Sequence, residues 1–406
     1  MPNPSDSERY RDILNRLAQF GTLSDAEVAE RLSTGLAGFL GRWEQEVLPF
    51  VAAGGAELRF VEGPNGRGKT HFLQALEVVA QRAGFATSRI ECGMDHTPFA
   101  SLQETYRAIA TTMRAGLLGQ NGSGTGVGGV LGGLSTERMA EFMKAPRGNP
   151  AFRNLVIACA RRAHSGFQRD QVTLDLRALL HHDTNRRVTF RDLFDGAKNL
   201  GTNLQRPLGR VGKRNAAVWL RSLLALPRQL GFKGLEKILV SMRVLLDAPD
   251  QRMERLALFG VFAAVPDIIQ QMKPAQFLSS RFQVVVPFHN GDNNAPVMDL
   301  SELGKQNEML RAMGEKLLQL GVQAHEWKVN LELQRRNLRR LADVTAGRRL
   351  EVNARRLYVK AWCSLLEEQM RNGEVEKTEV ELANLIDGVY AGFKQAEQSA
   401  KEEDLG

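Results

Sequence analysis

The chain of 406 residues lacks several features that would place it in a specialised class of protein. Its three cysteines, Cys92, Cys159 and Cys363, lie far apart, so a disulfide framework or a zinc knuckle is not expected. No apolar run reaches the roughly 18 residues that a membrane-spanning helix needs, and residues 1–13 lack the apolar core of a secretory signal. These absences favour a soluble cytoplasmic protein that does not associate with membranes.

Glutamate is missing from a long internal segment. Residues 144–233 contain 18 Lys+Arg, five Asp and no Glu, whereas residues 305–360 contain 13 basic and six acidic residues. Residues 361–406 reverse the sign, with four basic and eleven acidic residues. Solvated helical faces normally mix Glu with Lys, so the first segment favours contact with a polyanion such as nucleic acid, and we expect DNA as the partner. A charged face exposed only to solvent is the alternative.

The remaining composition, with 43% hydrophobic and 25% charged residues, is that of an ordinary globular protein, and the length suits two or three domains at roughly 150 residues each. Residues 57–62 and 85–91 are strand-like and enclose a helical pattern over 70–83, which predicts a strand–loop–helix–strand unit. Residues 103–113 are helical in pattern, residues 237–246, 256–265 and 282–288 are strand-like, and the pattern from 300 onward is helical.

We therefore expect an α/β fold with a P-loop NTPase core on a parallel sheet, a helical insertion and a C-terminal all-helical domain. Residues 119–133 contain eight glycines, and we expect them to form a flexible loop or linker. The predicted parts are an N-terminal helical segment (1–50), the first part of the ATP-binding domain (51–118), the Gly-rich loop with the basic helical insertion (119–235), the rest of the ATP-binding domain (236–290) and the C-terminal helical domain (291–406).

A complete phosphate-loop motif, GxxxxGK[ST], lies between the first predicted strand and its helix. It consists of Gly63, Pro64, Asn65, Gly66, Arg67, Gly68, Lys69 and Thr70. The glycines let backbone N–H groups face a phosphate, and the following helix N-terminus favours an anion. The lysine supplies a charge to the β- and γ-phosphates, and the threonine hydroxyl ligates Mg²⁺. The sequence thus predicts binding of ATP with Mg²⁺ by residues 63–71, in which His71 caps or packs.

Hydrolysis requires acidic residues as well, and these are not where the pattern would place them. A Mg²⁺-binding acid and a second acid are expected at the end of a buried strand beside the phosphate-loop strand. The candidate strand, residues 237–246, carries Ser241 and Met242 at its expected end. Asp247 is the only replacement that the sequence offers there, although a turn or a helix cap also suits it. We therefore expect slow hydrolysis or none.

Several segments together resemble the P-loop ATP-binding proteins of bacterial BREX phage-defence systems, of the BrxD-like type. They are GPNGRGKTHFLQALEVVAQRAGF, ATSRIEC, SLQETYRAIATTMR and WLRSLLALPRQLGFKGLEKILV, with FAAVPDII and Ser280-Arg281-Phe282 behind them. The likeness runs from about residue 50 to 288, with a looser helical match beyond. It implies an AAA+-like ATPase that works with DNA-directed partners and other defence proteins, and a homo-oligomer by analogy.

The chain departs from this family at two polar positions. Ser241 and Met242 replace the family's acidic pair, and Val265 precedes Pro266 where the family's sensor strand has Thr. Arg281 matches the family's downstream arginine, which the resemblance implies to be catalytic, and a surface arginine is the alternative. The resemblance therefore supports nucleotide binding more than turnover.

Three functions remain open from the sequence. The first is a nucleotide-gated, DNA-associated component of an antiphage system with weak or absent hydrolysis. The second is an active DNA-stimulated ATPase that remodels or translocates on DNA, and the third is an ATP-dependent scaffold for an acidic protein partner. A second basic segment, residues 335–340, either contacts DNA phosphates or pairs with the acidic tail of the same chain.

Overall fold

The computed structural model of the chain describes residues 4–20, 32–63, 68–90, 101–115, 125–144, 148–164, 170–233, 235–237, 258–264, 285–287, 297–300, 306–348 and 354–403. It divides into two compact units. The first unit comprises Met1–Gly41, Phe60–Leu76 and Ala263–Gly406, and the second comprises Arg42–Arg59 and Glu77–Phe262. None of the helices in the described ranges is long and apolar enough to cross a membrane.

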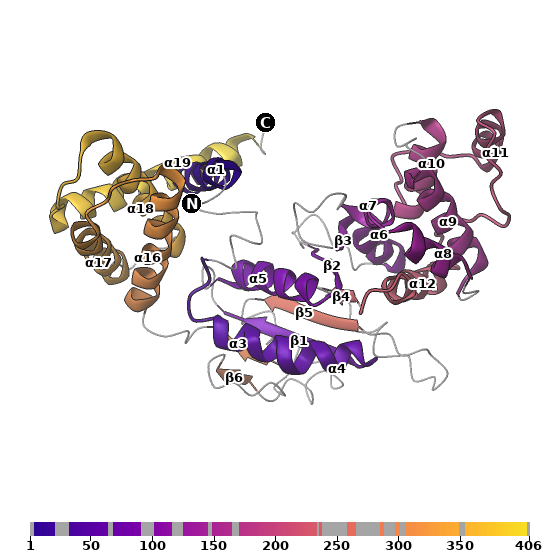
Figure 1. Cartoon of the computed structure of the whole chain (residues 1–406), viewed down its shortest axis with the longest axis horizontal. Coiled ribbons are helices and arrows are strands. Elements are labelled where there is room, and N and C mark those ends of the chain that lie inside the picture. The colour runs from indigo at the N-terminus through magenta and orange to yellow at the C-terminus, as the bar shows by residue number, and fades with distance from the viewer. Residues whose placement is uncertain are drawn as a thin grey trace. The chain divides into compact units, whose positions relative to one another are not determined.

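The described strands form one seven-stranded sheet (Figure 1). The strands are β1 (Ala56–Glu62), β2 (Ala86–Ser88), β3 (Met113–Ala115), β4 (Leu235–Lys237), β5 (Leu258–Ala264), β6 (Val285–Pro287) and β7 (Val297–Asp299). Their order is β3-β2-β4-β5-β1-β7-β6. The pairs β2–β4, β4–β5, β1–β7 and β6–β7 are parallel, and β3 runs antiparallel to β2. The expected parallel sheet is therefore present, with one antiparallel edge strand.

The sheet order places β4, which ends where the candidate acidic strand begins, away from the phosphate-loop strand. Asp247 was expected at the end of a strand directly beside the phosphate-loop strand, but β5 lies between β4 and β1. The candidate strand is described only as β4, and residues 238–257 lie outside the described ranges. The sheet also includes β7, which was not expected and lies beyond residue 290, where the helical domain was predicted to have begun. A three-residue strand gives too short a pattern to be recognised from sequence.

Helix α5 (Lys69–Arg82) follows β1 and confirms the predicted strand–loop–helix unit. Its carboxyl-terminal half belongs to the second unit, where the buried Glu77 carboxylate lies 3.7 Å from the guanidinium groups of Arg89 and Arg114. Thr87 Oγ1 and Gln81 Nε2 donate hydrogen bonds to the same carboxylate, at 3.3 and 3.4 Å. A buried acid needs such partners because desolvation disfavours its charge. These contacts hold α5 against β2 and β3.

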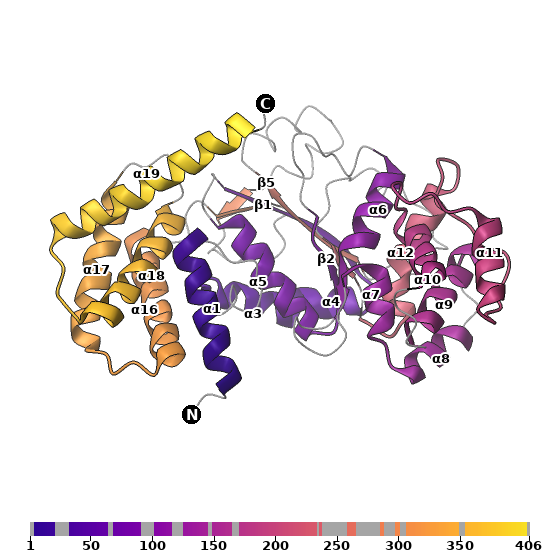
Figure 2. The same ribbon diagram turned by 90° about the horizontal axis from the view of Figure 1, so that it is seen from above.

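A helical bundle makes up most of the described part of the first unit. It contains α1 (Pro4–Phe20), α16 (Gln306–His325), α17 (Leu331–Gly347), α18 (Ala354–Asn372) and α19 (Glu379–Glu403). Helix α1 lies beside α16 and α18 (Figure 2), and its Ile13, Leu14 and Leu17 share one buried cluster with Trp362. The Trp362 indole N–H donates to the Gly314 carbonyl oxygen at 3.0 Å. The N-terminal helix therefore packs with helices from the other end of the chain.

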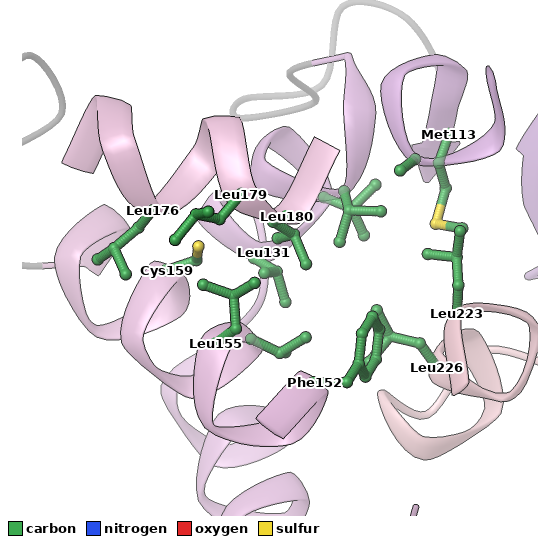
Figure 3. Close-up of a cluster of buried hydrophobic side chains, with 14 of the residues drawn as sticks. Met113, Leu131, Phe152, Leu155, Cys159, Leu176, Leu179, Leu180, Leu223 and Leu226 are labelled. Carbon is green, nitrogen blue, oxygen red and sulfur yellow. The ribbon is translucent and has the colours of Figure 1, made fainter. Parts of the chain in front are cut away.

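The described part of the second unit is largely a helical body. Its helices are α6 (Leu102–Thr112), α7 (Gly126–Gly132), α8 (Thr136–Lys144), α9 (Pro150–His164), α10 (Gln171–His181), α11 (Phe190–Asn199) and α12 (Ala216–Gln229). Three short elements precede it, α3 (Ala37–Arg42), the π-helix η1 (Trp43–Val47) and α4 (Leu48–Ala52), of which α3 lies almost wholly in the first unit. The body has a continuous apolar core in which Leu131, Leu155, Leu176 and Leu180 meet (Figure 3).

Part of the Gly-rich segment folds as helix α7, so its prediction as a flexible loop was wrong for residues 126–132. Val127 and Leu131 are fully buried, and a side chain on Gly132 would contact Ala163 of α9. Glycine disfavours helices by about 1 kcal/mol per residue relative to alanine. Burial of the valine and leucine side chains against α9 and α10 overrides that cost. Residues 116–124 lie outside the described ranges.

Candidate functional site

The turn between β1 and α5 contains the phosphate-loop residues, all in the first unit. Gly63 follows β1 and is buried, residues 64–67 lie outside the described ranges, and α5 begins at Lys69. Gly68 has φ of +89°, a backbone conformation that favours glycine. The first helical hydrogen bond runs from the Phe72 N–H to the Gly68 carbonyl oxygen at 2.8 Å. The backbone N–H groups of residues 69–71 therefore lie in the first turn of α5, where helices favour anions.

Lys69 folds back over this turn. Its Nζ donates a hydrogen bond to the Gly63 carbonyl oxygen at 2.6 Å, which closes the loop across the motif. Partial burial lowers the pKa of Lys69 from its ordinary value. An anion bound in the loop would oppose that lowering, because a nearby negative charge favours the protonated amine. The positive charge of Lys69 and the N-terminus of α5 thus lie together at the phosphate loop.

The next two residues differ in environment. Thr70 is exposed, whereas the His71 imidazole Nε2 lies 2.9 Å from the hydroxyl of Ser33. Burial lowers the pKa of His71 to about 4, and the positive charges of Arg355 and Lys316 act in the same direction. His71 is therefore neutral at pH 7, and its imidazole contacts Ser33.

An arginine that the sequence did not single out approaches the loop from the helical bundle. Arg355, in the first turn of α18, places its Nη1 where a side chain on Gly68 would have to lie. Its Nη2 donates to the sulfur of Met309 on α16 at 3.5 Å. Lys316, also on α16, donates through Nζ to the Ser33 carbonyl oxygen. Nothing in the spacing of these residues indicates the approach, because 287 positions separate Gly68 from Arg355.

Two carboxylates flank the same edge of the sheet. Glu62 and Asp299 are register partners at the ends of β1 and β7, and the Leu300 N–H donates to the Glu62 carbonyl oxygen at 2.9 Å. Paired residues of adjacent strands place their side chains on the same face of the sheet. From the sequence, Asp247 was the only acid expected near the motif. The pair of Glu62 and Asp299 was not predicted, because β7 was not predicted as a strand.

The other sequence-predicted site residues cannot be placed. Ser241, Met242, Asp247, Val265, Pro266 and Arg281 lie outside the described ranges, as do Pro64, Asn65, Gly66 and Arg67. Their expected roles therefore remain predictions. The first three follow β4 and the next two follow β5, and these two strands are parallel to each other.

The basic segment 144–233 forms helices of the second unit and exposes many of its cations. The exposed residues are Lys144, Arg161, Arg187, Arg191, Lys198, Arg206, Arg210, Lys213, Arg214, Arg221, Arg228 and Lys233. Other arginines of the segment are structural. Arg162 is buried and pairs with Asp170, and the Arg186 Nε lies 2.6 Å from Asp175. The positive surface is thus concentrated but smaller than the sequence count suggests.

The four arginines of segment 335–340 lie on α17, and three of them pair within the same chain. Arg335 contacts Glu315 at 2.8 Å, and Arg336 and Arg340 contact Glu376 at 3.0 and 2.7 Å. Arg340 Nη1 also donates to the Lys377 carbonyl oxygen at 2.9 Å. Glu376 belongs to the acidic tail, so these contacts support the alternative in which the segment pairs with the tail.

Comparison with known proteins gives a match to a family. Residues 7–149 match the family model of the BREX system ATP-binding protein BrxC/D. The resemblance to BREX ATP-binding proteins is confirmed over that range, which includes the phosphate loop and begins further toward the N-terminus than expected. No curated protein matches the chain, and no solved structure matches it. The match shows a likeness to the ATP-binding proteins of BREX systems over residues 7–149, and it ends before the predicted segments at 219–288.

Proposed function

We propose that the chain is an AAA+-like P-loop protein that binds ATP with Mg²⁺ through residues 63–71 and acts as a nucleotide-gated, DNA-associated component of its defence system. The loop fits the group: Gly68 adopts a positive φ, and Lys69 already crosses the motif to Gly63. A nucleotide bound with Mg²⁺ supplies a polyphosphate, and this polyphosphate carries more negative charge in ATP than in ADP. Lys69 neutralises the phosphates, and the exposed Thr70 hydroxyl is accessible to ligate Mg²⁺.

The position of Arg355 carries the gating part of the proposal. Its guanidinium lies against Gly68 and comes from α18, so a phosphate charge in the loop attracts the helical bundle of the same unit. Arginine suits this role because its planar fork binds phosphate oxygens through two parallel hydrogen bonds. We propose this phosphate contact for Arg355 in addition to the catalytic role that the resemblance implies for Arg281.

Titration calorimetry with ATP and Mg²⁺ tests nucleotide binding. Lys69→Ala should abolish measurable binding, because it removes the charge at the β- and γ-phosphates. Arg355→Ala should weaken ATP more than ADP, by a factor of about 10 for a charge-assisted hydrogen bond of about 1.5 kcal/mol. Arg356→Ala is the matched control, since Arg356 is the next residue of α18 and instead lies 4.5 Å over the Phe393 ring. Unchanged ATP affinity in Lys69→Ala would refute the assignment of the loop.

The proposed partner is DNA, which the exposed cations of residues 144–233 would contact through its backbone without base specificity. Other proteins of the defence system and further copies of the chain are proposed partners by family analogy. An acidic protein is the rival partner for the same surface. A mobility-shift assay with DNA at low salt tests the first partner, and a pull-down from nuclease-treated lysate tests the acidic protein. Together the two experiments distinguish these partners. A protein captured in the absence of nucleic-acid binding would favour the scaffold function.

We further propose that hydrolysis is slow, because Ser241 and Met242 supply no carboxylate. Losing a group that positions or activates water typically lowers a rate by about 10²–10⁴-fold. Phosphate release with and without DNA should stay near background in the wild-type protein. Robust turnover that disappears in Asp247→Ala would instead make this a DNA-stimulated ATPase with a shifted acid. Robust turnover that survives in Asp247→Ala but disappears in Asp299→Asn would place the essential acid on β7.

A further inference from the structure

A pocket of about 670 Å³ opens on the second unit, away from the phosphate-loop residues in sequence. Helix α11 and residues 206–208 line it, with Phe190, Phe194, Arg206, Pro207 and Leu208 among its walls. Its volume falls within the range of roughly 300–1,000 Å³ that small-molecule sites have. Figure 2 shows α11 at the outer end of the helical body to which it belongs.

The sequence of α11 explains why two phenylalanines face this pocket. The helix begins after Thr189, whose Oγ1 accepts from the Asp192 N–H at 3.2 Å. Leu193 and Ala197 form its buried face, and a side chain on Gly196 would meet Val172 of α10. Phe190 and Phe194 are four residues apart, so they share another face, which lines the pocket and remains half-buried.

Arginines surround these rings. The Arg206 guanidinium carbon lies 4.3 Å from the centre of the Phe194 ring, and that of Arg210 lies 5.6 Å from the centre of the Phe190 ring. Both arginines are exposed. Asp195, the acid that lines the pocket, lies 3.9 Å from Arg191, so its charge is offset within the same helix. Residues 186–214 hold eight Lys+Arg against Asp192 and Asp195.

We propose that this pocket holds an unstacked base of a single-stranded nucleic acid, with Arg206 and Arg210 on the adjoining phosphates. The inference rests on the proposed contact between the second unit and nucleic acid. It adds that the second unit recognises the single-stranded form. Aromatic rings beside cations form the stacking platforms of sequence-tolerant single-strand binding. A duplex keeps its bases stacked and paired, so it cannot fill the pocket without the cost of extruding one.

Fluorescence anisotropy at low salt with labelled oligothymidylate, oligouridylate and a duplex tests the proposal. Phe194→Leu keeps an apolar side chain but removes the ring, and should weaken single-strand binding by about 5- to 100-fold. Phe194→Tyr should retain it, because the ring face remains. Duplex affinity should stay nearly constant in both variants. Phe50→Ala, at an exposed phenylalanine of the same unit, is the control and should change neither affinity.

The outcomes separate this inference from the proposed function. Single-strand binding that is equal in Phe194→Leu and wild type, with duplex binding retained, overturns the base pocket and leaves the nucleic-acid surface intact. Binding of neither form at low salt overturns both. Phe194-dependent binding of labelled polyglutamate without any binding of oligonucleotide overturns both in favour of an acidic protein. Weakened binding in Phe194→Leu with retention in Phe194→Tyr supports the pocket, and the two oligonucleotides then show whether DNA or RNA is preferred.

Discussion

At the scale of single residues, Gly68 meets two constraints at once. Its φ of +89° disfavours any side chain, and the Arg355 guanidinium occupies the place of a Cβ. Gly373 has a similar φ of +94° with open space around it, so Gly373→Ala measures the backbone cost alone. That cost is about 1–2 kcal/mol. Gly68→Ala should lower the melting temperature further than Gly373→Ala and also weaken ATP binding. Equal melting shifts would mean that Arg355 does not approach the loop.

Two half-buried histidines, His71 and His181, lead to a prediction about pH. Burial lowers the pKa of His71 and of His181 to about 4, against about 6.5 in an unfolded chain. The unfolded chain therefore binds more protons between these values, so stability falls as pH drops from about 6.5 towards 4. Each histidine contributes up to about 1.4 kcal/mol per pH unit in that window. His71→Asn and His181→Asn should each flatten the fall in melting temperature between pH 6.5 and 5.

The residues of the phosphate loop could be identified from sequence because the motif is local. Lys69 needs only its own loop and helix to find the Gly63 carbonyl oxygen. Arg355 could not be identified, because its approach depends on how α18 packs against α16 and on the entire course of the chain between. Local motifs carry their geometry with them, whereas a residue brought in by tertiary packing leaves no pattern.

At the scale of elements, α7 shows that the burial of apolar side chains can stabilise a helix whose glycine-rich composition disfavours it. Leu131 is fully buried among Leu155, Leu176 and Leu180, although it lies in the Gly-rich segment (Figure 3). Leu131→Ala should lower the free energy of unfolding by about 2–5 kcal/mol, as large-to-small core substitutions do. Leu174→Ala, at a partly exposed position of α10, should change it little. Denaturant unfolding measures both, and similar effects would indicate that α7 does not pack in the core.

The longer periodic elements were predicted well, and three-residue strands were predicted only where a longer strand-like segment contains them. Helices α5 and α6 begin within one residue of their expected starts, and β5 and β6 fall inside the strand-like segments. Strands β3 and β7 have three residues each, too few for alternation to show. The order of the strands could not be predicted from the sequence either. The pattern of a strand-like segment shows that it pairs with other strands, but it does not show which ones.

At the scale of the whole molecule, the N-terminal helix shows what periodicity alone cannot supply. The sequence predicted an N-terminal helical segment over residues 1–50 and named no partner for it. Ile13, Leu14 and Leu17 instead complete the core of the bundle formed by residues 306–403. An amphipathic helix specifies that it must bury one face, and the fold decides which partner covers that face.

Charge distribution leads to the last prediction. The exposed cations of the second unit, Arg187 and Lys213 among them, differ from Arg336 and Arg340, which pair with Glu376. A cation that neutralises a phosphate releases a counterion and steepens the fall of DNA affinity with salt. A cation already paired in its own chain must first give up that partner, so it contributes less. Duplex binding measured at several salt concentrations should therefore separate the two groups.

Replacing Arg187 and Lys213 together by glutamine should reduce the slope of log affinity against log salt by about 0.9 for each duplex phosphate that the protein no longer neutralises. The matched pair, Arg336→Gln with Arg340→Gln, should leave the slope unchanged and instead lower the melting temperature, because Glu376 is left without these partners. A salt slope that falls only in the Arg336→Gln, Arg340→Gln variant would mean that these two arginines leave Glu376 and contact DNA phosphates instead. The tail would then compete with DNA from within the same unit, and Glu376→Gln should raise DNA affinity.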